Sequence, residues 1–282
     1  MVCSRLQFFI FLFYFFLPCQ TLRCTTNCSF TYNLTQLFDI PNQCGQIVSA
    51  GKCIASVKFS YQTQKYTVQI DADPSTYIYR AETRRFAYII LSPIIPIFFY
   101  YDIHYSCQNT DDCARDLIRN AAIEILQRQF QIGAIENELA PLISSPPSIS
   151  KNLTLNCYDS KENILQCNTS RKPGFCLIQH KIESNSINHS CTHEKSHISV
   201  YIMTYLLIND STFDVACNLS LCNNNSTLRD VKELMFKHNV TVTLSGRLMD
   251  NEKIEIIGNN GSKWIESIIL ITMMIVALAL HS

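Results

Sequence analysis

Glycine and charged residues are both scarce in this chain of 282 residues. Only 7 glycines are present, and neither G-x-G-x-x-G nor a Walker pattern occurs, which excludes the common Gly-rich phosphate loops. Charged residues make up 16% of the chain, and 23 Lys plus Arg balance 23 Asp plus Glu. A nucleic-acid-binding protein needs a basic surface to offset phosphate. The zero net charge therefore predicts no nucleic-acid partner.

Familiar catalytic motifs are also missing. No G-x-S-x-G nucleophile elbow is present. A cysteine nucleophile requires an unpaired thiolate. Once the signal peptide described below is removed, the number of cysteines is even, so all of them can pair and no free thiol is expected. The single tryptophan, Trp264, lies near the C-terminus, and no lectin-like constellation is visible. We expect no catalytic residue, no metal and no cofactor.

The N-terminus predicts a secretory signal peptide over residues 1–20. Arg5 precedes the predominantly apolar run 6–17, and Pro18 ends that run. Spanning a bilayer takes about 20 residues, so this run is too short to be a transmembrane helix. The chain is expected to enter the secretory pathway.

The C-terminus predicts a glycosylphosphatidylinositol (GPI) anchor signal. Small residues at 259–262 are followed by the short spacer 263–267 and the apolar tail 268–280. Asn260 is the first choice for the lipid attachment residue, and Asn259 is the second. The spacer is shorter than the usual 8–12 residues or so, which leaves a single transmembrane span as the alternative. Either anchor makes the membrane a partner and places the protein at the outer face of the plasma membrane.

Sequons and cysteines both predict an extracellular glycoprotein. N-x-[ST] sequons mark surface asparagines in a secreted chain, and they begin at Asn27, Asn33, Asn152, Asn168, Asn188, Asn209, Asn218, Asn224, Asn225, Asn239 and Asn260. Removal of Cys3 and Cys19 with the signal leaves an even number of cysteines in an oxidising compartment. The predicted disulfide cysteines are Cys24, Cys28, Cys44, Cys53, Cys107, Cys113, Cys157, Cys167, Cys176, Cys191, Cys217 and Cys222.

The spacing of these cysteines predicts two extracellular modules. Six cysteines precede a Pro- and Ser-rich linker at 141–151, and six follow it. We place the first module at 21–140 and the second at 152–245, followed by a stalk at 246–260 and the anchor signal at 261–282. Each half closes with two nearby cysteines and a helical-looking segment. This similarity indicates a diverged tandem duplication; coincidence within one disulfide-rich domain is the alternative.

The segments between the cysteines predict a mainly β fold with short helices (α+β). Segments 54–62, 66–72 and 198–208 are rich in β-branched and aromatic residues. The apolar run 86–101 contains Pro93 and Pro96, which favours two short strands joined at the prolines. Residues 117–126 show helical spacing, and Asp111 and Asp112 are expected to cap that helix. Modules this small predict a thin core held by disulfides, each contributing about 2–4 kcal/mol.

One motif offers an enzymatic alternative. Residues 193–197, HEKSH, match H-E-x-x-H, in which His193 and His197 would bind zinc if they lay on a helix. His189, Glu233 or His238 could add a ligand. The sequon at Asn188 lies just upstream and a strand-like segment follows, so the context does not suit the helix of a zinc peptidase. We interpret the motif as a histidine-rich exposed loop.

The second half resembles the three-finger family of lymphocyte antigens, urokinase-receptor domains and snake toxins. The residues that carry the resemblance are L-x-C-Y at 155–158 and the closing C-x4-C-N, which spans Cys217, Cys222 and Asn223. The resemblance implies the pairs Cys157–Cys176, Cys167–Cys191 and Cys217–Cys222, with Asn223 tying the chain end to the domain core. One further disulfide usual in the family is missing. The first half fits poorly, because its last cysteine spacing is five and Ala114 replaces the asparagine.

The sequence therefore predicts a glycosylated, lipid-anchored and non-catalytic surface protein. We expect it to bind another protein or a surface glycan through disulfide-stapled loops, since binding surfaces commonly lie on loops. A secreted zinc metallopeptidase using His193 and His197 is the alternative. The identity of the partner does not follow from the sequence.

Overall fold

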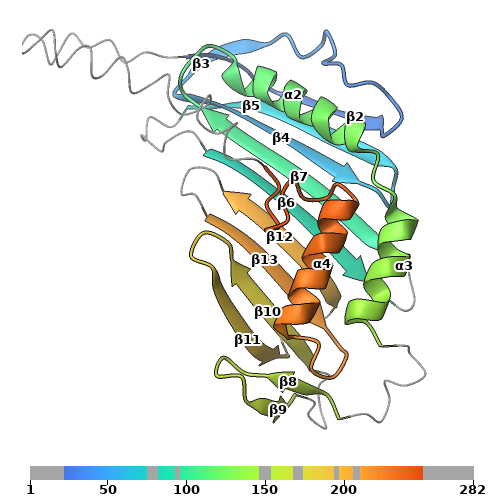
Figure 1. The fold of residues 1–282 in the computed structure, drawn as a ribbon. Coiled ribbons are helices and arrows are strands. Elements are labelled where there is room, and N and C mark those ends of the chain that lie inside the picture. Colours follow the sequence, from blue (N-terminus) through green and yellow to red (C-terminus); the bar gives the residue numbers. More distant parts are fainter. Residues whose placement is uncertain are drawn as a thin grey trace, which may run out of the picture.

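The computed structural model describes residues 22–74, 82–92, 96–145, 154–167, 174–193, 197–205 and 210–249 (Figure 1). The predicted signal peptide, the anchor signal with Asn259 and Asn260, and the sequons at Asn152, Asn168 and Asn209 lie outside these residues. Within these ranges, no helix has both the length and the apolar character that a bilayer crossing requires.

Most strands of the described residues join one large antiparallel sheet. Its nine strands run in the order β11-β10-β13-β12-β6-β7-β4-β5-β2, and two small sheets pair β1 with β3 and β8 with β9. The strands are β1 (Leu22–Thr25), β2 (Cys28–Asn33), β3 (Ile47–Ala50), β4 (Lys52–Ser60), β5 (Lys65–Asp73), β6 (Glu82–Leu91), β7 (Phe98–Cys107), β8 (Asn156–Tyr158), β9 (Ile164–Gln166), β10 (Phe175–Lys181), β11 (Ser186–Thr192), β12 (Ile198–Tyr205) and β13 (Asp210–Cys217). The predicted mainly β fold with short helices is confirmed.

The helices of the described residues lie on one face of the large sheet (Figure 1). They are α2 (Cys113–Arg128), α3 (Ile132–Ile143) and α4 (Asn225–Lys237). Helix α2 packs on β4 and β7, whereas α3 packs on α4 and β13. The apolar spacing predicted α2, and its Ile118 and Ile125 are fully buried. Helix α3 was not predicted, and its Pro141 and Ile143 extend it into the segment assigned to the linker.

Alternation along the strands separates a buried sheet face from an open one. In β4 and β7, every second side chain points toward the helices and is fully buried, including Val57, Phe59, Phe99 and Tyr101. The buried side chains of both halves form one continuous cluster. The predicted thin core is therefore wrong, because the joined sheet gives the helices one wide apolar surface to cover.

The two halves have the same topology. The first half contributes β5-β4-β7-β6 and the second contributes β11-β10-β13-β12, which is the same order of equivalent strands. Cys24–Cys53 ties β1 to β4, and Cys157–Cys176 ties β8 to β10 in the same way. Cys107–Cys113 and Cys217–Cys222 both close the end of the last strand. The first half, whose cysteine spacing fitted the three-finger pattern poorly, thus repeats the architecture of the second.

The halves meet where β6 pairs with β12, and we call this strand pair the seam. The antiparallel register runs from Leu91 opposite Ile198 to Arg84 opposite Tyr205. Ile89 and Val200 face each other on the helix side of the seam and are fully buried. Hydrogen bonds and core packing both cross the seam, so the sheet is continuous from one module to the other.

Asp111 and Asp112 do not cap α2, contrary to the sequence prediction. Asp111 Oδ1 accepts the backbone N–H of Arg23 at 2.9 Å, and Asp112 accepts both the N–H and the hydroxyl of Thr25 at 2.8 Å. Asp112 precedes α2 with φ 51°, and its side chain makes no cap bond. The two carboxylates instead connect β1 to the start of α2. These two segments lie far apart in the sequence.

Residues at the start of the predicted stalk belong to the folded part of the chain. Leu248 is fully buried, and its N–H donates to Thr204 Oγ1 at 3.1 Å. Arg247 forms an ion pair with Glu183 at 3.1 Å. The second module therefore continues to at least Met249 rather than ending at residue 245, because the chain returns to pack on β12 and β13.

We expect Gly246→Ala to destabilise the protein by roughly 1–3 kcal/mol. Gly246 has φ +100°, a conformation that suits glycine. An added Cβ would also lie 2.5 Å from Cδ2 of the buried Phe213 ring. Denaturant unfolding of the variant measures the loss. Gly133→Ala is the matched control, because a Cβ at Gly133 meets nothing within 4 Å; equal stability of the two variants would contradict the packing of residues 246–249.

A partly buried ion pair joins α2 to the sheet and predicts acid sensitivity. Arg85 is 3% exposed, and its Nη2 lies 3.0 Å from Glu124 Oε2, while Arg128 Nη2 lies 2.6 Å from Glu124 Oε1. Burial alone would raise the pKa of Glu124, but the hydrogen bonds and charges of Arg85 and Arg128 lower it to about 2. Because the folded-state pKa is depressed, this contribution to stability is fully present above the unfolded value of 4.5 and is lost as the pH falls toward 2.

Glu124→Gln is accordingly expected to cost about 2 kcal/mol at neutral pH, since it leaves Arg85 buried beside a neutral group. We reduce the figure from that of a fully buried pair because Glu124 is partly exposed. The variant should also lose stability less steeply than the parent between pH 4.5 and 2. Chemical unfolding at several pH values tests both points, with Asp116→Asn on the exposed side of α2 as the control. Parallel pH curves for parent and E124Q would refute this role.

Candidate functional site

The sheet face away from the helices carries large side chains at its centre. On the seam, Tyr88 faces Tyr201 and Phe86 faces Met203 across the strand pair. These side chains are half-buried although no helix of the described residues lies over them. The opposite positions of the same strands point into the core, so β6 and β12 carry apolar side chains on both faces. We call the side of the sheet that bears Tyr88 and Tyr201 the open face.

Five aromatic rings on the open face form one connected cluster. Phe98 stacks on Tyr100 with ring centroids 6.2 Å apart, and Tyr100 contacts Phe86 at 5.6 Å. Phe86 continues to Tyr201 at 6.4 Å, and Tyr201 meets Tyr88 edge-on at 6.0 Å. We call these five residues the aromatic cluster. A contiguous apolar patch that the rest of the fold leaves partly uncovered commonly marks an interaction site.

The aromatic cluster lines a depression of about 400 Å³, whose lining is completed by Asp214. Asp214 lies on β13 directly opposite Tyr201, and one of its oxygens accepts from Gln179 Nε2 at 3.4 Å. Burial raises the pKa of Tyr201, and the negative charge of Asp214 raises it further. The depression is thus apolar, with a single carboxylate at its edge.

A second, more polar depression of about 610 Å³ adjoins it on the first half of the open face. Lys58, Arg84, Asp102 and His104 are among its lining residues. Asp102 accepts a hydrogen bond from Tyr100 at 3.3 Å, which connects the two depressions. Burial raises the pKa of Asp102 to about 6, although the charge of Lys58 and the Tyr100 hydroxyl act in the opposite direction. Both signs of charge are present, so this region suits polar contacts at the rim of a binding surface.

The zinc-site alternative requires His193 and His197 to lie on one helix, and neither residue lies on a helix. His193 directly follows β11 and His197 directly precedes β12, so the two described ends of the HEKSH motif belong to a strand connection. His189 is buried in β11, and His238 lies 3.3 Å from Glu138 near the end of α4. Glu233 is exposed on α4, within 3.9 Å of Arg229. Among the described residues, no three potential ligands gather as a metal site.

All twelve cysteines predicted to pair are in disulfides. The first half contains Cys24–Cys53, Cys28–Cys44 and Cys107–Cys113. The second half contains the three pairs that the three-finger resemblance implied, namely Cys157–Cys176, Cys167–Cys191 and Cys217–Cys222. Six disulfides are typical of an extracellular or secreted protein.

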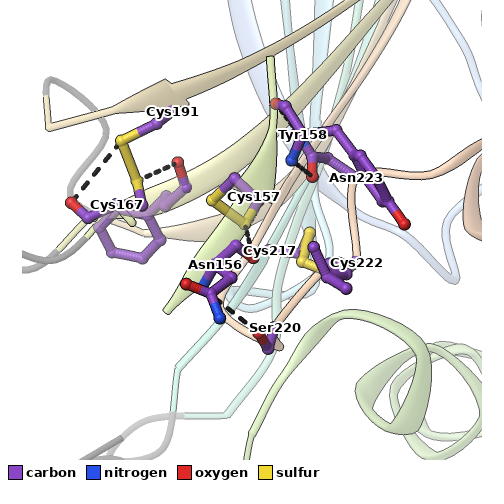
Figure 2. Close-up of a disulfide and its surroundings, with 12 residues drawn as sticks. Asn156, Cys157, Tyr158, Cys167, Cys191, Cys217, Ser220, Cys222 and Asn223 are labelled. Carbon is purple, nitrogen blue, oxygen red and sulfur yellow. Dashed lines mark hydrogen bonds between the residues drawn. A yellow bond between two sulfur atoms is a disulfide. The ribbon is translucent and has the colours of Figure 1, made fainter. Parts of the chain in front are cut away.

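Asn223 completes this disulfide region, as Figure 2 shows. Its Oδ1 accepts the N–H of Tyr158 at 2.9 Å, and its Nδ2 donates to the carbonyl of Tyr158 at 2.8 Å. The same Nδ2 lies within 3.4 Å of the carbonyls of Leu177 and Ser190. Asn223 is fully buried, so one amide holds the connection between β13 and α4 against β8, β10 and β11, the tie to the domain core that the resemblance implied.

The described sequons lie at the edges of the sheet or on its helix side rather than across the centre of the open face. Asn33 ends β2 and Asn188 lies in β11, and these strands are the two edges of the large sheet. Asn27 precedes β2, while Asn225 begins α4 and Asn239 follows it; all of these asparagines are exposed. The remaining described pair is half-buried: Asn218 accepts the N–H of Ser145, and Asn224 caps α4 by accepting the N–H of Thr227. The seam strands β6 and β12 contain no sequon.

Sequence reasoning missed the open face as a site. The segment 86–101 was predicted to form two apolar strands, and function was expected in the loops or in the histidine motif. One signal in the sequence could have revealed it. Aromatic residues stand at alternate positions, Phe86 and Tyr88, and the positions between and after them are also apolar. Such strands have two apolar faces, and only one of them can be covered by the helix layer.

No family model matches the chain, and a search of curated proteins finds no similar sequence.

Proposed function

We propose that this chain is a non-catalytic, glycosylated cell-surface protein that binds another protein or a surface glycan. The observation that carries the proposal is the aromatic cluster at the centre of the open face, with the described sequons placed toward its edges and on the helix side. Tyr, Phe, Met and Arg are enriched at the cores of protein interfaces. Tyr201, Met203 and Arg84 lie together here, which favours a protein as the partner.

The proposal includes the origin and the attachment of the molecule. We infer two diverged three-finger-like modules produced by tandem duplication, because equivalent strands and disulfides recur in both halves. The C-terminal signal is proposed to attach a GPI anchor at Asn260 or Asn259. Binding is proposed at the open face of the sheet rather than at the disulfide-stapled loops. Phosphatidylinositol-specific phospholipase should release the protein from cells; failure of release would favour a single transmembrane span.

Cell binding by a tetramer of the glycosylated extracellular part tests the proposed function. We expect binding that is abolished by the double change Phe86→Ala and Tyr201→Ala, since hot-spot truncations at an interface centre each cost about 2 kcal/mol or more. Ile123→Ala, an exposed apolar change on α2, is the matched control and should bind normally. Trypsin treatment of the target cells should remove the binding site, whereas loss of binding only after glycosidase treatment would identify a glycan partner. Equal binding by the Phe86→Ala, Tyr201→Ala double variant and the parent would refute the proposal.

A further inference from the structure

We propose that Lys232 and His180 form a pH-sensitive latch, which holds α4 on the second half of the sheet at neutral pH and releases it when His180 is protonated. Lys232 lies on α4 and is 8% exposed, and His180 lies on β10 and is 5% exposed (Figure 1). Lys232 Nζ and His180 Nδ1 are 2.6 Å apart. Two ionisable groups away from solvent thus link the helix layer directly to the sheet.

The hydrogen bonds define where the protons of this pair lie. A lysine ammonium can only donate, so the ring atom that faces it, Nδ1 of His180, must accept. The proton of the neutral ring is then on Nε2, which donates to Asn185 Oδ1 at 3.2 Å. A further proton can enter only at Nδ1, where it would point at the ammonium group of Lys232. Protonation of His180 therefore replaces a hydrogen bond by a contact between two donors that are both positively charged.

The strands on both sides of His180 place no negative charge against its ring. In the register, His180 lies opposite Ile187 of β11 and opposite Phe213 of β13. His189 lies on the same face of β11, opposite Ile178, and it adds a second basic ring rather than an acid. The centroid of the Phe213 ring lies 5.5 Å from Lys232 Nζ, so this ring attracts the charge that the lysine already carries.

The carboxylates nearest to the latch are already paired with arginines. Glu183, in the turn after β10, forms an ion pair with Arg247 at 3.1 Å. On α4, Asp230 and Glu233 are exposed and lie within 2.9 Å and 3.9 Å of Arg229. A second positive charge at His180 would therefore be poorly compensated, and the opening of α4 to water would relieve it.

The shifted acidities of the pair agree with this geometry. Burial and the charge of Lys232 lower the pKa of His180 from 6.5, although the Asn185 hydrogen bond and the charge of Glu183 act in the opposite direction. Burial lowers the pKa of Lys232 to about 8, so most molecules keep the ammonium at neutral pH. Because closed α4 disfavours the proton on His180, the stability of the closed form is fully present above pH 6.5 and falls below it. Glu124 acts in a separate interval, below pH 4.5.

Release of the latch is expected to stay local and reversible. Cys217–Cys222 ties the segment before α4 to the end of β13 at any pH, and Asn224 caps the helix from its own end. The buried side chains of Val231 and Met235 still favour the closed position. A surface protein meets pH values of about 5–6 after uptake into acidic compartments, where histidines act as pH sensors.

Hydrogen–deuterium exchange of the purified, glycosylated mature protein tests the latch at about pH 7.5 and about pH 5.5. After correction for the intrinsic pH dependence of exchange, the protection of the α4 amides should fall by up to about tenfold per pH unit below 6.5, since the open form binds one more proton. The amides of α2 should keep their protection. His180→Asn supplies a neutral acceptor to Lys232 and cannot be protonated, so it should abolish the loss. His238→Asn, at the end of α4, is the matched control and should respond like the parent.

A second variant tests the latch without altering the histidine. Lys232→Met removes one of the two charges, so the loss of protection in acid should be smaller than in the parent. Lys237→Met, an exposed change on the same helix, should leave that loss unchanged. Equal protection of α4 at both pH values in the parent would overturn the inference, and so would a loss that persists in His180→Asn. An equal loss in α2 would show general acid unfolding instead of a latch.

Discussion

Full reduction of the six disulfides is expected to unfold the protein without added denaturant. Each bridge contributes about 2–4 kcal/mol by restricting the unfolded chain. Together they are comparable to, or larger than, the total stability of about 5–15 kcal/mol typical of a folded domain. The core is wide, but β1, β3, β8 and β9 form only two-stranded sheets. Such small sheets are marginal alone, so the disulfides that tie them to β4 and β10 should decide whether they stay folded.

The size of each loop provides an internal control for this prediction. Cys24–Cys53 closes a separation of 29 residues, whereas Cys217–Cys222 closes one of 5. Replacing the first pair by alanines should cost about 1.5 kcal/mol more than replacing the second, if loop entropy dominates. Far-UV circular dichroism before and after reduction measures the overall effect. A reduced and alkylated chain that keeps its cooperative melting transition would contradict the role given to the disulfides.

The two halves, expressed separately, are expected to aggregate instead of folding as monomers. Separation exposes β6 and β12, which are long and carry buried apolar residues such as Ile89 and Val200. An exposed, long and apolar edge strand is a template for pairing with other chains. In the intact sheet this hazard is avoided, because the two strands pair with each other along the seam.

Sedimentation of the two fragments, 21–145 and 152–249, measures this outcome, since the first of them keeps the whole of α3. Mixing them during oxidative refolding should recover a soluble heterodimer, since each supplies the missing edge of the other. The intact chain should unfold in one transition, and Ile89→Ala should lower the stability of both halves together. Soluble monomeric fragments with separate cooperative transitions would show that the modules are independent and that the seam is a contact of little energetic weight.

Local patterns in the sequence predicted much of this fold. The β-branched and aromatic segments predicted β4, β5 and β12, and the apolar spacing of Ile118, Ala121 and Ile125 predicted α2. The three cysteine pairs of the second half followed from the spacing of a known family, because that spacing reflects one covalent framework. These features depend on neighbours within a few tens of residues.

Features that depend on distant contacts could not be predicted in this way. Asp112 looked like a helix cap, but its partner, Thr25, is 87 positions away. Gly246 looked like the beginning of a stalk because nothing nearby shows that Phe213 packs against it. The seam could not be predicted either, since no local pattern indicates that β6 and β12 pair with each other. The aromatic cluster depends on that pairing, so the candidate site became visible only with the sheet assembled.

Site-specific photo-crosslinking on target cells tests the open face most directly as the binding surface. A benzophenone side chain is placed at Met203, beside the aromatic cluster on the open face, or at Glu233, exposed on α4 on the helix side. Our account predicts a crosslinked partner from position 203 and none from position 233, with the crosslink at 203 lost when Phe86 is changed to alanine. A partner captured from position 233 and absent from position 203 would show that binding occurs on the helix side and would contradict the account.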